Sequence, residues 1–192
     1  REQAALFKTE LLKSPDIIDV ASKNGGGWGT VAKVNSDSTM QFAYETIDES
    51  YIPLLRIHLL QGRNFSKEFP SDSSQSVLVN QAFAKKAGWK NPIGQQVDFW
   101  YNNKKYTVIG LVADYHFESL TREIGPQLFT MKADNPYGMS FIKIKPHSET
   151  ASLKYIQATF KKLFPMNPYN YTFKNEENIK NYEAEAKWKQ IM

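Results

Sequence analysis

Helical spacing of apolar residues alternates along the chain with the period-two pattern that is typical of strands. Residues 2–13 show helical spacing, which predicts a helix that Ser14-Pro15 ends, because proline lacks an amide hydrogen and restricts the residue before it. A second helix is predicted from Ser148, its expected N-cap, to Pro165. The apolar face of this second helix consists of Leu153, Ile156, Phe160 and Leu163.

Between these helices, short apolar segments separated by turn residues predict strands. Alternation is clearest where polar residues separate Val97, Phe99 and Tyr101, after which Asn102-Asn103 turns the chain. The continuous apolar run at residues 77–79 is typical of a strand that is buried on both faces. The predicted strands are residues 16–22, 30–35, 39–47, 77–79, 97–101, 106–112, 139–145 and 169–175.

Local signals predict two short helices and a tight turn. Asp48 is expected to cap a short helix that Gly62 ends, and Asn80 is expected to cap another that Gly88 closes. Residues 91–94, Asn-Pro-Ile-Gly, predict a tight turn, since proline fixes φ and glycine can supply a positive φ.

Both ends of the chain are expected to be helices that rest on the rest of the domain. The segment from Glu176 onward is polar with a narrow apolar stripe, which predicts a helix. The residues expected to fix the two terminal helices to the domain are Leu6, Leu11, Ile179, Tyr182 and Trp188.

Two polar, turn-rich segments divide the chain, at residues 66–76 and at residues 133–138. We therefore predict an α+β fold in two subdomains. Residues 1–65 and 137–192 would form a mixed α/β subdomain built from both chain ends, and residues 66–136 would form an inserted β-rich subdomain. A strand–helix–strand unit at residues 139–174 would belong to the first of these.

Composition narrows the class of protein. The 192 residues are 41% hydrophobic, which is enough for a sizeable core, and no run of about 18 apolar residues is present. The absence of cysteine excludes disulfides and Cys-based zinc sites. The net charge of +4 raises the possibility of nucleic-acid binding, but the lysines alternate with acidic residues, which favours a solvated surface. The start at Arg1, without methionine, indicates a segment of a longer chain.

The strongest candidates for chemistry are Asp114, His116 and Glu118, which would share one face of an extended strand. They could begin a metal site or form an acid–base pair, or they could be polar residues that face water where a strand ends. A metal site needs three or four ligands, and no second ligand pair lies nearby in the sequence. We therefore predict no catalytic, cofactor-binding or metal-binding residues.

The other candidates also have simpler interpretations. His58 lies among apolar residues and is expected to be a partly buried histidine, while His147 is expected in a turn before a helix. Residues 25–29, Gly-Gly-Gly-Trp-Gly, lead into a predicted strand. A phosphate-binding glycine loop should open a helix instead, so we expect a hairpin or surface loop there.

Three segments, in this order, resemble one protein family. They are residues 51–66, YIPLLRIHLLQGRNFS; residues 77–97, VLVNQAFAKKAGWKNPIGQQV; and residues 106–129, YTVIGLVADYHFESLTREIGPQLF. The chain resembles the MacB-like periplasmic core domain of FtsX-like ABC transporter permeases, in the form found in Bacteroidetes. The resemblance extends over roughly residues 10 to 175.

The resemblance implies a non-enzymatic domain on the periplasmic side of the inner membrane, located between two transmembrane helices of a permease. Such a domain would couple the binding of a partner or substrate to ATP-driven movement of those helices. The implied partners are the transmembrane helices of the same chain, a second permease copy, an ABC ATPase subunit and a periplasmic or outer-membrane protein. No cofactor is implied. A free-standing extracytoplasmic ligand-binding or sensor module is the alternative.

Overall fold

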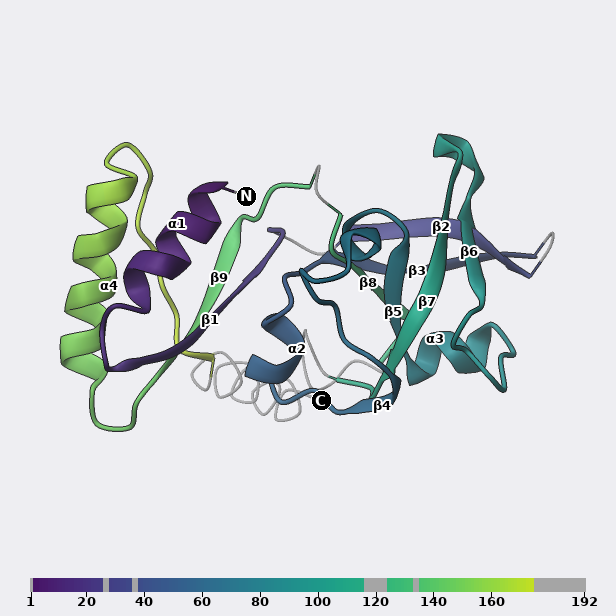
Figure 1. Ribbon diagram of the computed structural model, residues 1–192, viewed down its shortest axis with the longest axis horizontal. Helices are drawn as coiled ribbons and strands as arrows, with labels where there is room; N and C mark the ends of the chain where they lie inside the picture. Colours follow the sequence, from purple (N-terminus) through teal and green to yellow (C-terminus); the bar gives the residue numbers. More distant parts are fainter. Residues whose placement is uncertain (1, 26–27, 36–37, 116–123, 133–134, 175–192) are drawn as a thin grey trace, which may run out of the picture.

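The computed structural model describes residues 2–25, 28–35, 38–115, 124–132 and 135–174 (Figure 1). Within them, the strands form two sheets, one of seven strands and one of two, accompanied by helices. This arrangement confirms the predicted α+β class. Among these residues, no helix has both the length and the apolar character needed to cross a membrane.

The larger sheet closes on itself. Its order is β4-β7-β5-β8-β3-β2-β6, and β6 also pairs with β7, so six strands form a closed barrel and β4 is attached outside it. A closed barrel has no free edges among its member strands. The strands are β2 (Trp28–Asn35), β3 (Ser38–Thr46), β4 (Leu59–Gly62), β5 (Ser76–Asn80), β6 (Gln96–Phe99), β7 (Lys104–Val112) and β8 (Gln127–Thr130).

Side chains that alternate along these strands fill the barrel. Phe42, Val79, Val97 and Val108 are buried inside it, and α3 (Gln81–Lys86) contributes Phe83 to the same core. Two 3₁₀ helices, η1 (Pro70–Ser73) and η2 (Trp100–Asn102), lie in the connections.

The smaller sheet lies at the other end of the molecule (Figure 1). It pairs β1 (Ile17–Lys23) antiparallel with β9 (Met139–Ile144), and α1 (Glu2–Leu11) packs with α4 (Glu149–Leu163) beside it. Phe7, Leu11, Val20 and Ile156 form its core. β9, from the C-terminal part of the chain, thus pairs with a strand from the first 50 residues.

The boundary predicted at residue 65 does not coincide with the division between the two sheets. Strands β2 and β3 were expected with the chain ends, but both belong to the barrel, where β3 pairs parallel with β8. The reason is that their alternate residues, among them Ala32 and Phe42, are needed to fill the barrel core. A division into two subdomains remains a proposal, and strand pairing favours its first boundary near residue 25.

Two predicted elements are different in the structure. The helix expected between Asp48 and Gly62 is only the single turn α2 (Tyr51–Leu54), after which the chain enters strand β4. The strand expected at residues 169–175 is absent from the described residues 169–174, although Tyr169 packs on Phe160 of α4. The helix expected after Glu176 lies outside the described residues.

The expected contacts of α1 also need one correction. Leu11 is fully buried, but Leu6 is 48% exposed, and Phe7 takes the buried place between Phe160 and Phe164. The period of 3.6 residues explains this, because residues 7 and 11 lie on the same face of the helix.

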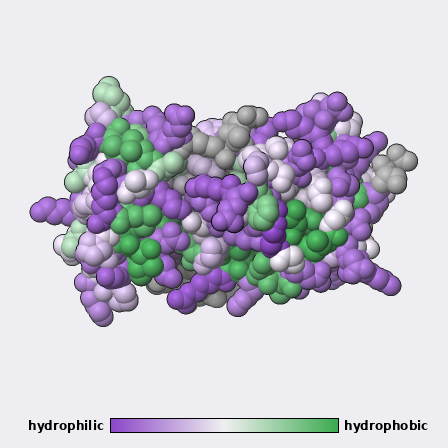
Figure 2. All heavy atoms as spheres, viewed as in Figure 1, coloured by the Kyte–Doolittle hydropathy of each residue, from purple (hydrophilic) through white to green (hydrophobic). Residues whose placement is uncertain are grey.

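Two caps and one turn test the short-range predictions, and the expected cap at Asp48 is wrong, because Ser50 is the N-cap of α2. The Asn80 side chain accepts a hydrogen bond from the Phe83 amide and so caps α3, and Gly88 follows the helix with φ +72°. Gly94 has φ +87° in the predicted turn. Most of the face seen in Figure 2 is polar, with apolar side chains in separate groups.

Candidate functional site

Of the three polar residues proposed as a possible site, only Asp114 lies among the described residues. Its Oδ1 accepts a hydrogen bond from the Ala82 amide at 2.9 Å, and its own amide donates to Gln81 Oε1 at 3.3 Å. Asp114 therefore provides a hydrogen-bond acceptor for a backbone amide in the first turn of α3, which is a structural role. His116 and Glu118 lie outside the described residues.

The two other histidines are both exposed. His58 was expected to be partly buried, but its side chain faces outward from the strand edge, while its backbone carbonyl accepts from the Ala113 amide at 2.8 Å. His147 lies in the turn before α4 with φ +64°, as predicted. Within the described part of the chain, no three His, Asp or Glu side chains are grouped closely enough to hold a metal ion.

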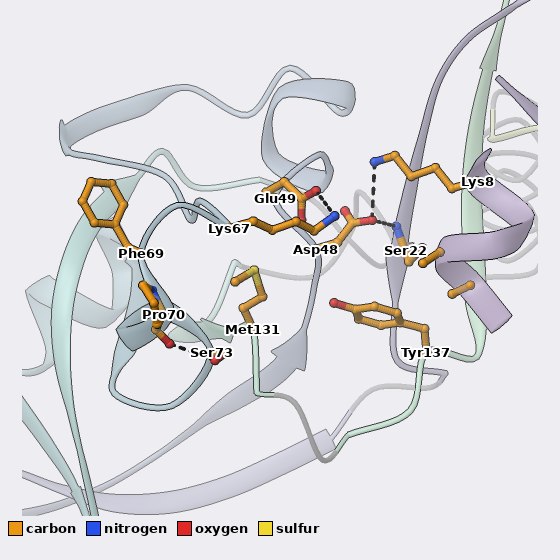
Figure 3. Close-up of a pocket in the computed structure, with 12 residues that line it drawn as sticks. Lys8, Ser22, Asp48, Glu49, Lys67, Phe69, Pro70, Ser73, Met131 and Tyr137 are labelled. Atoms are coloured by element: carbon orange, nitrogen blue, oxygen red, sulfur yellow. Dashed lines mark hydrogen bonds and ion pairs between the residues drawn. The ribbon is translucent and has the colours of Figure 1, made fainter. Parts of the chain in front are cut away.

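A cavity of about 270 Å³ lies between α1 and the barrel (Figure 3). Phe69 and Pro70 form one side of it, and α1, with Lys8, forms the other. Met131 and Tyr137 lie between these two sides. Much of the wall is therefore apolar, and small residues of α1, Ala4 and Ala5, leave space in it.

Two ion pairs lie at one end of this cavity, which we call the α1 cavity. Lys8 Nζ lies 3.9 Å from Asp48 Oδ2 and donates a hydrogen bond to Ser50 Oγ at 2.7 Å. Lys67 Nζ lies 2.7 Å from Glu49 Oε1. Asp48 is also held by backbone amides, since its Oδ2 accepts from the Ser22 amide at 2.8 Å and its Oδ1 from the Ser50 amide at 3.1 Å.

The two carboxyl groups respond differently to this environment. Burial raises the pKa of Asp48 above its usual value, and the charge of Lys8 with the two amide hydrogen bonds only partly opposes this. Burial also acts to raise the pKa of Glu49, but the hydrogen bond and charge of Lys67 outweigh it, so the pKa of Glu49 is lowered. The neighbouring lysine and hydrogen bonds therefore offset the effect of burial less completely at Asp48 than at Glu49.

We expect the titration midpoint of Asp48, followed by ¹³C NMR of its carboxyl carbon, to lie above that of an aspartate in an unfolded chain, because burial raises its pKa. Because the pKa is raised on folding, protonated Asp48 contributes stability that is complete below the unfolded-state pKa and is lost as pH rises through the folded-state pKa. Lys8→Met should raise the midpoint further, because the charge of Lys8 lowers the pKa of Asp48. Lys13→Met, which removes an ammonium just after α1 that is paired with Glu10, is the control and should leave it unchanged. A midpoint that is insensitive to Lys8 would contradict this electrostatic account.

The chain matches the family model described as MacB-like periplasmic core domain over residues 2–157. This match includes both sheets, α1 and most of α4. The chain belongs to this family.

Solved structures agree with the family at the level of the fold. The periplasmic region of MacB from Actinobacillus actinomycetemcomitans has 20% identity and a TM-score of 0.66, with 83% of this chain and 73% of that chain covered. The extracellular domain of the noncanonic ABC-type transporter YknZ from Gram-positive bacteria has 13% identity and a TM-score of 0.66, with 87% and 84% covered. A domain of a putative permease protein from Porphyromonas gingivalis has 12% identity, a TM-score of 0.55 and coverage of 84% and 82%. Among curated proteins, none matches the sequence.

The segments that resemble the MacB-like family have structural roles in this chain. Gly62 and Gly110 stand opposite each other where β4 and β7 pair, and Asn80 joins α3 to β8 by accepting from the Gln127 amide as well as from Phe83. Arg63 donates two hydrogen bonds to the buried Asp72. These motifs therefore specify the MacB-like fold, and none of them lines the α1 cavity.

The α1 cavity was not predicted, because its walls come from segments far apart in the sequence. Residues 4–8, 48–49 and 67–73, with Met131 and Tyr137, meet there only after the chain has folded. The nearest sequence signals were the polar segment at residues 66–76 and Asp48, which was expected to act as a helix cap. Asp48 does accept from the Ser50 amide just before α2, but it also links β1 and α1 to the barrel.

Proposed function

We propose that this chain is the periplasmic domain of an ABC transporter permease, and that it couples the binding of a partner or substrate to ATP-driven movement of transmembrane helices. The observation that carries the proposal is the family match over residues 2–157, which includes α1 and most of α4. In the structure these two helices pack against each other through Phe7 and Phe160. Movement applied to α1 would therefore reach the sheet of β1 and β9 through a continuous apolar core.

In this proposal the domain lies on the periplasmic side of the inner membrane. Its partners are transmembrane helices of the same chain, a second permease copy, an ABC ATPase subunit and a periplasmic or outer-membrane protein. It performs no catalysis of its own. The proposal that both ends of the chain continue into transmembrane helices and leave the domain on the same side depends on residues beyond 174, and it stays a prediction.

Location can be tested by labelling a single cysteine. Met166, in the loop after α4, is 92% exposed, and the chain has no cysteine of its own. In the full-length protein, freed of any other cysteine, Met166→Cys should react with a membrane-impermeant maleimide in intact cells whose outer membrane has been permeabilised. A cysteine at the buried Val79 is the control for accessibility. Labelling of Met166→Cys only after lysis of the inner membrane would contradict a periplasmic location.

Coupling can be tested with the same position. Spin labels at Met166→Cys on two permease copies, in the complex with the ATPase, report the distance between the two domains. We expect the distance distribution to differ between the nucleotide-free and ATP–vanadate states, because closure of the ATPase subunits would move the helices attached to each domain. A distance distribution that is the same in both nucleotide states, in a complex with normal ATPase activity, would contradict coupling through this domain.

A further inference from the structure

The described residues form two packed bodies. The chain-end body consists of α1, β1, β9 and α4, and the barrel body consists of strands β2 to β8 with α3. Figure 1 shows the chain-end body at the left and the barrel body at the right. Each body has its own core, because Phe7, Leu11 and Ile156 belong to one apolar cluster and Phe42, Val79 and Val97 to another.

On one side, the two bodies are joined by a closely packed junction. Ala21 of β1 and Phe141 of β9 pack into the same cluster as Tyr51 of α2 and Phe129 of β8, and the Tyr51 and Phe141 rings meet edge-on with centroids 5.5 Å apart. Separation of the bodies at this junction would therefore lose apolar contact.

Polar groups at the junction are also paired across it. Lys23 lies 2.5 Å from Glu45, with side chains only 11% and 3% exposed. The Asn24 side chain accepts from the Thr46 amide at 2.8 Å, and the Asn24 amide donates to the Thr46 carbonyl at 2.9 Å. Separating such buried pairs would leave charges and amides without partners, which is costly.

Next to this junction, the contact between the bodies is loosely packed. There the α1 cavity lies between α1 and the segment with Phe69 and Pro70 (Figure 3), and Ala4 and Ala5 are among the residues that line it. Ala5 and Phe69 are exposed, so their apolar surfaces are not yet in contact with each other. Lys8 bridges the edge of this gap by its bonds to Ser50 and Asp48.

We propose that the α1 cavity is the opening side of a hinge, on which the chain-end body rocks against the barrel body, with the junction as the pivot and Lys8 as the latch. Closing the gap would bring Ala4 and Ala5 against Phe69 and Pro70 and bury apolar surface. Opening it would separate Lys8 from Asp48 while the junction stays packed. The structure thus has room for two arrangements that differ on one side only. This inference rests on the proposed function for the source of the movement.

The hinge is tested by a distance within one domain. Spin labels at Lys85→Cys on α3 and Gln157→Cys on α4, both exposed, report the two bodies separately. In the full-length permease with its ATPase, labelled protein is diluted with unlabelled protein so that each complex carries one labelled domain. We expect the mean distance to change by about 2–5 Å between the nucleotide-free and ATP–vanadate states. An unchanged distance overturns the hinge.

This outcome can be told apart from failure of the proposed function. If the distance between Met166→Cys labels on two copies responds to nucleotide and the distance within the domain does not, the domain moves as one rigid body, so coupling stands and the hinge is wrong. If neither distance responds, the proposed coupling fails as well.

The latch is tested by Lys8→Met, which keeps an apolar side chain and removes the ammonium group. It should change the ratio of the two arrangements in the nucleotide-free state by about three- to fivefold, as expected for a partly exposed ion pair. Lys13→Met is the matched control, since Lys13, just after α1, pairs with Glu10 of the same body, and it should leave the ratio unchanged. Equal effects of the two substitutions would overturn the role of Lys8.

Discussion

Replacing Gly62 with alanine should lower the free energy of unfolding of this domain by about 3 kcal/mol. Gly62 has φ +73°, a conformation that side chains other than hydrogen disfavour. A Cβ atom at this position would also lie 2.1 Å from the Ile109 carbonyl oxygen and 2.9 Å from Ile93 Cδ1. Because the first of these is backbone of the paired strand β7, the strands themselves would have to move apart.

Gly88 provides the control for this prediction. Its φ of +72° is nearly the same, but no heavy atom lies within 4 Å of the position of its Cβ. Gly88→Ala should therefore carry only the conformational cost, about 1 kcal/mol. Both values are measured by urea unfolding of the purified chain, followed by circular dichroism. If the two substitutions cost the same, close approach of β4 to β7 is not the reason for glycine at position 62.

Gly62 also shows how far the sequence could predict this region. The pattern correctly indicated a residue that needs positive φ, but it assigned that need to the end of a helix. In fact Gly62 stands in strand β4 opposite Gly110, whose own Cβ would lie 2.4 Å from the Arg63 carbonyl oxygen. A glycine in the sequence shows that space or positive φ is needed, but not which neighbouring strand creates the need.

Signals that act within a few residues were read correctly elsewhere. Asn80 specifies a helix cap through its bond from the Phe83 amide, and Gly88 and Gly94 specify a helix end and a turn through their positive φ. The assignment of β2 and β3 was wrong, because it depended on the parallel pairing of β3 with β8, more than 80 residues away in the chain. Alternation predicts that a segment is a strand but does not identify its partner.

The α1 cavity could not be predicted from the sequence for the same reason. Nothing in the sequence distinguishes Lys8 and Lys67 from ordinary surface charges, and Asp48 was interpreted only as a helix cap. Only the fold brings Lys8 to Ser50 and Lys67 to Glu49. Arg63, near this cavity, lies in the segment of residues 51–66 that resembles the family.

Arg63 and Asp72 form an ion pair with two hydrogen bonds near the wall of the α1 cavity. Arg63 Nη1 donates to Asp72 Oδ2 at 2.6 Å and Nη2 to Oδ1 at 2.8 Å, while the Ser66 amide donates to Oδ2 at 2.9 Å. The Arg63 guanidinium also lies 4.1 Å from the centre of the Phe69 ring. Asp72 thus holds the loop of residues 66–73, and with it Phe69 and Pro70 of the cavity wall, against the barrel.

Asp72→Ala should lower the free energy of unfolding by about 2–4 kcal/mol at pH 7. The Asp72 side chain is fully buried, so its removal leaves the Ser66 amide and the guanidinium without their acceptor. We place the value below the largest known for buried pairs, because the Arg63 side chain is 39% exposed and can regain water. Asp98→Ala is the control: Asp98 is paired with Lys105 at 3.5 Å, and the lysine side chain is 69% exposed, so its loss should cost less than about 1 kcal/mol.

The effect of Asp72→Ala should also depend on pH, with a sign fixed by the pKa of Asp72. Burial acts to raise this pKa, but the hydrogen bonds from Arg63 and the Ser66 amide lower it more, so it lies below the usual value. A carboxyl whose pKa is lowered on folding contributes stability above its unfolded-state pKa and loses it as pH falls through the folded-state pKa. The difference between wild type and Asp72→Ala, measured by urea unfolding from pH 7 to about pH 2, should therefore be constant above about pH 5 and shrink below about pH 4. A difference that stays constant through the acid range would show that the charge of Asp72 contributes nothing and that its effect is one of packing alone.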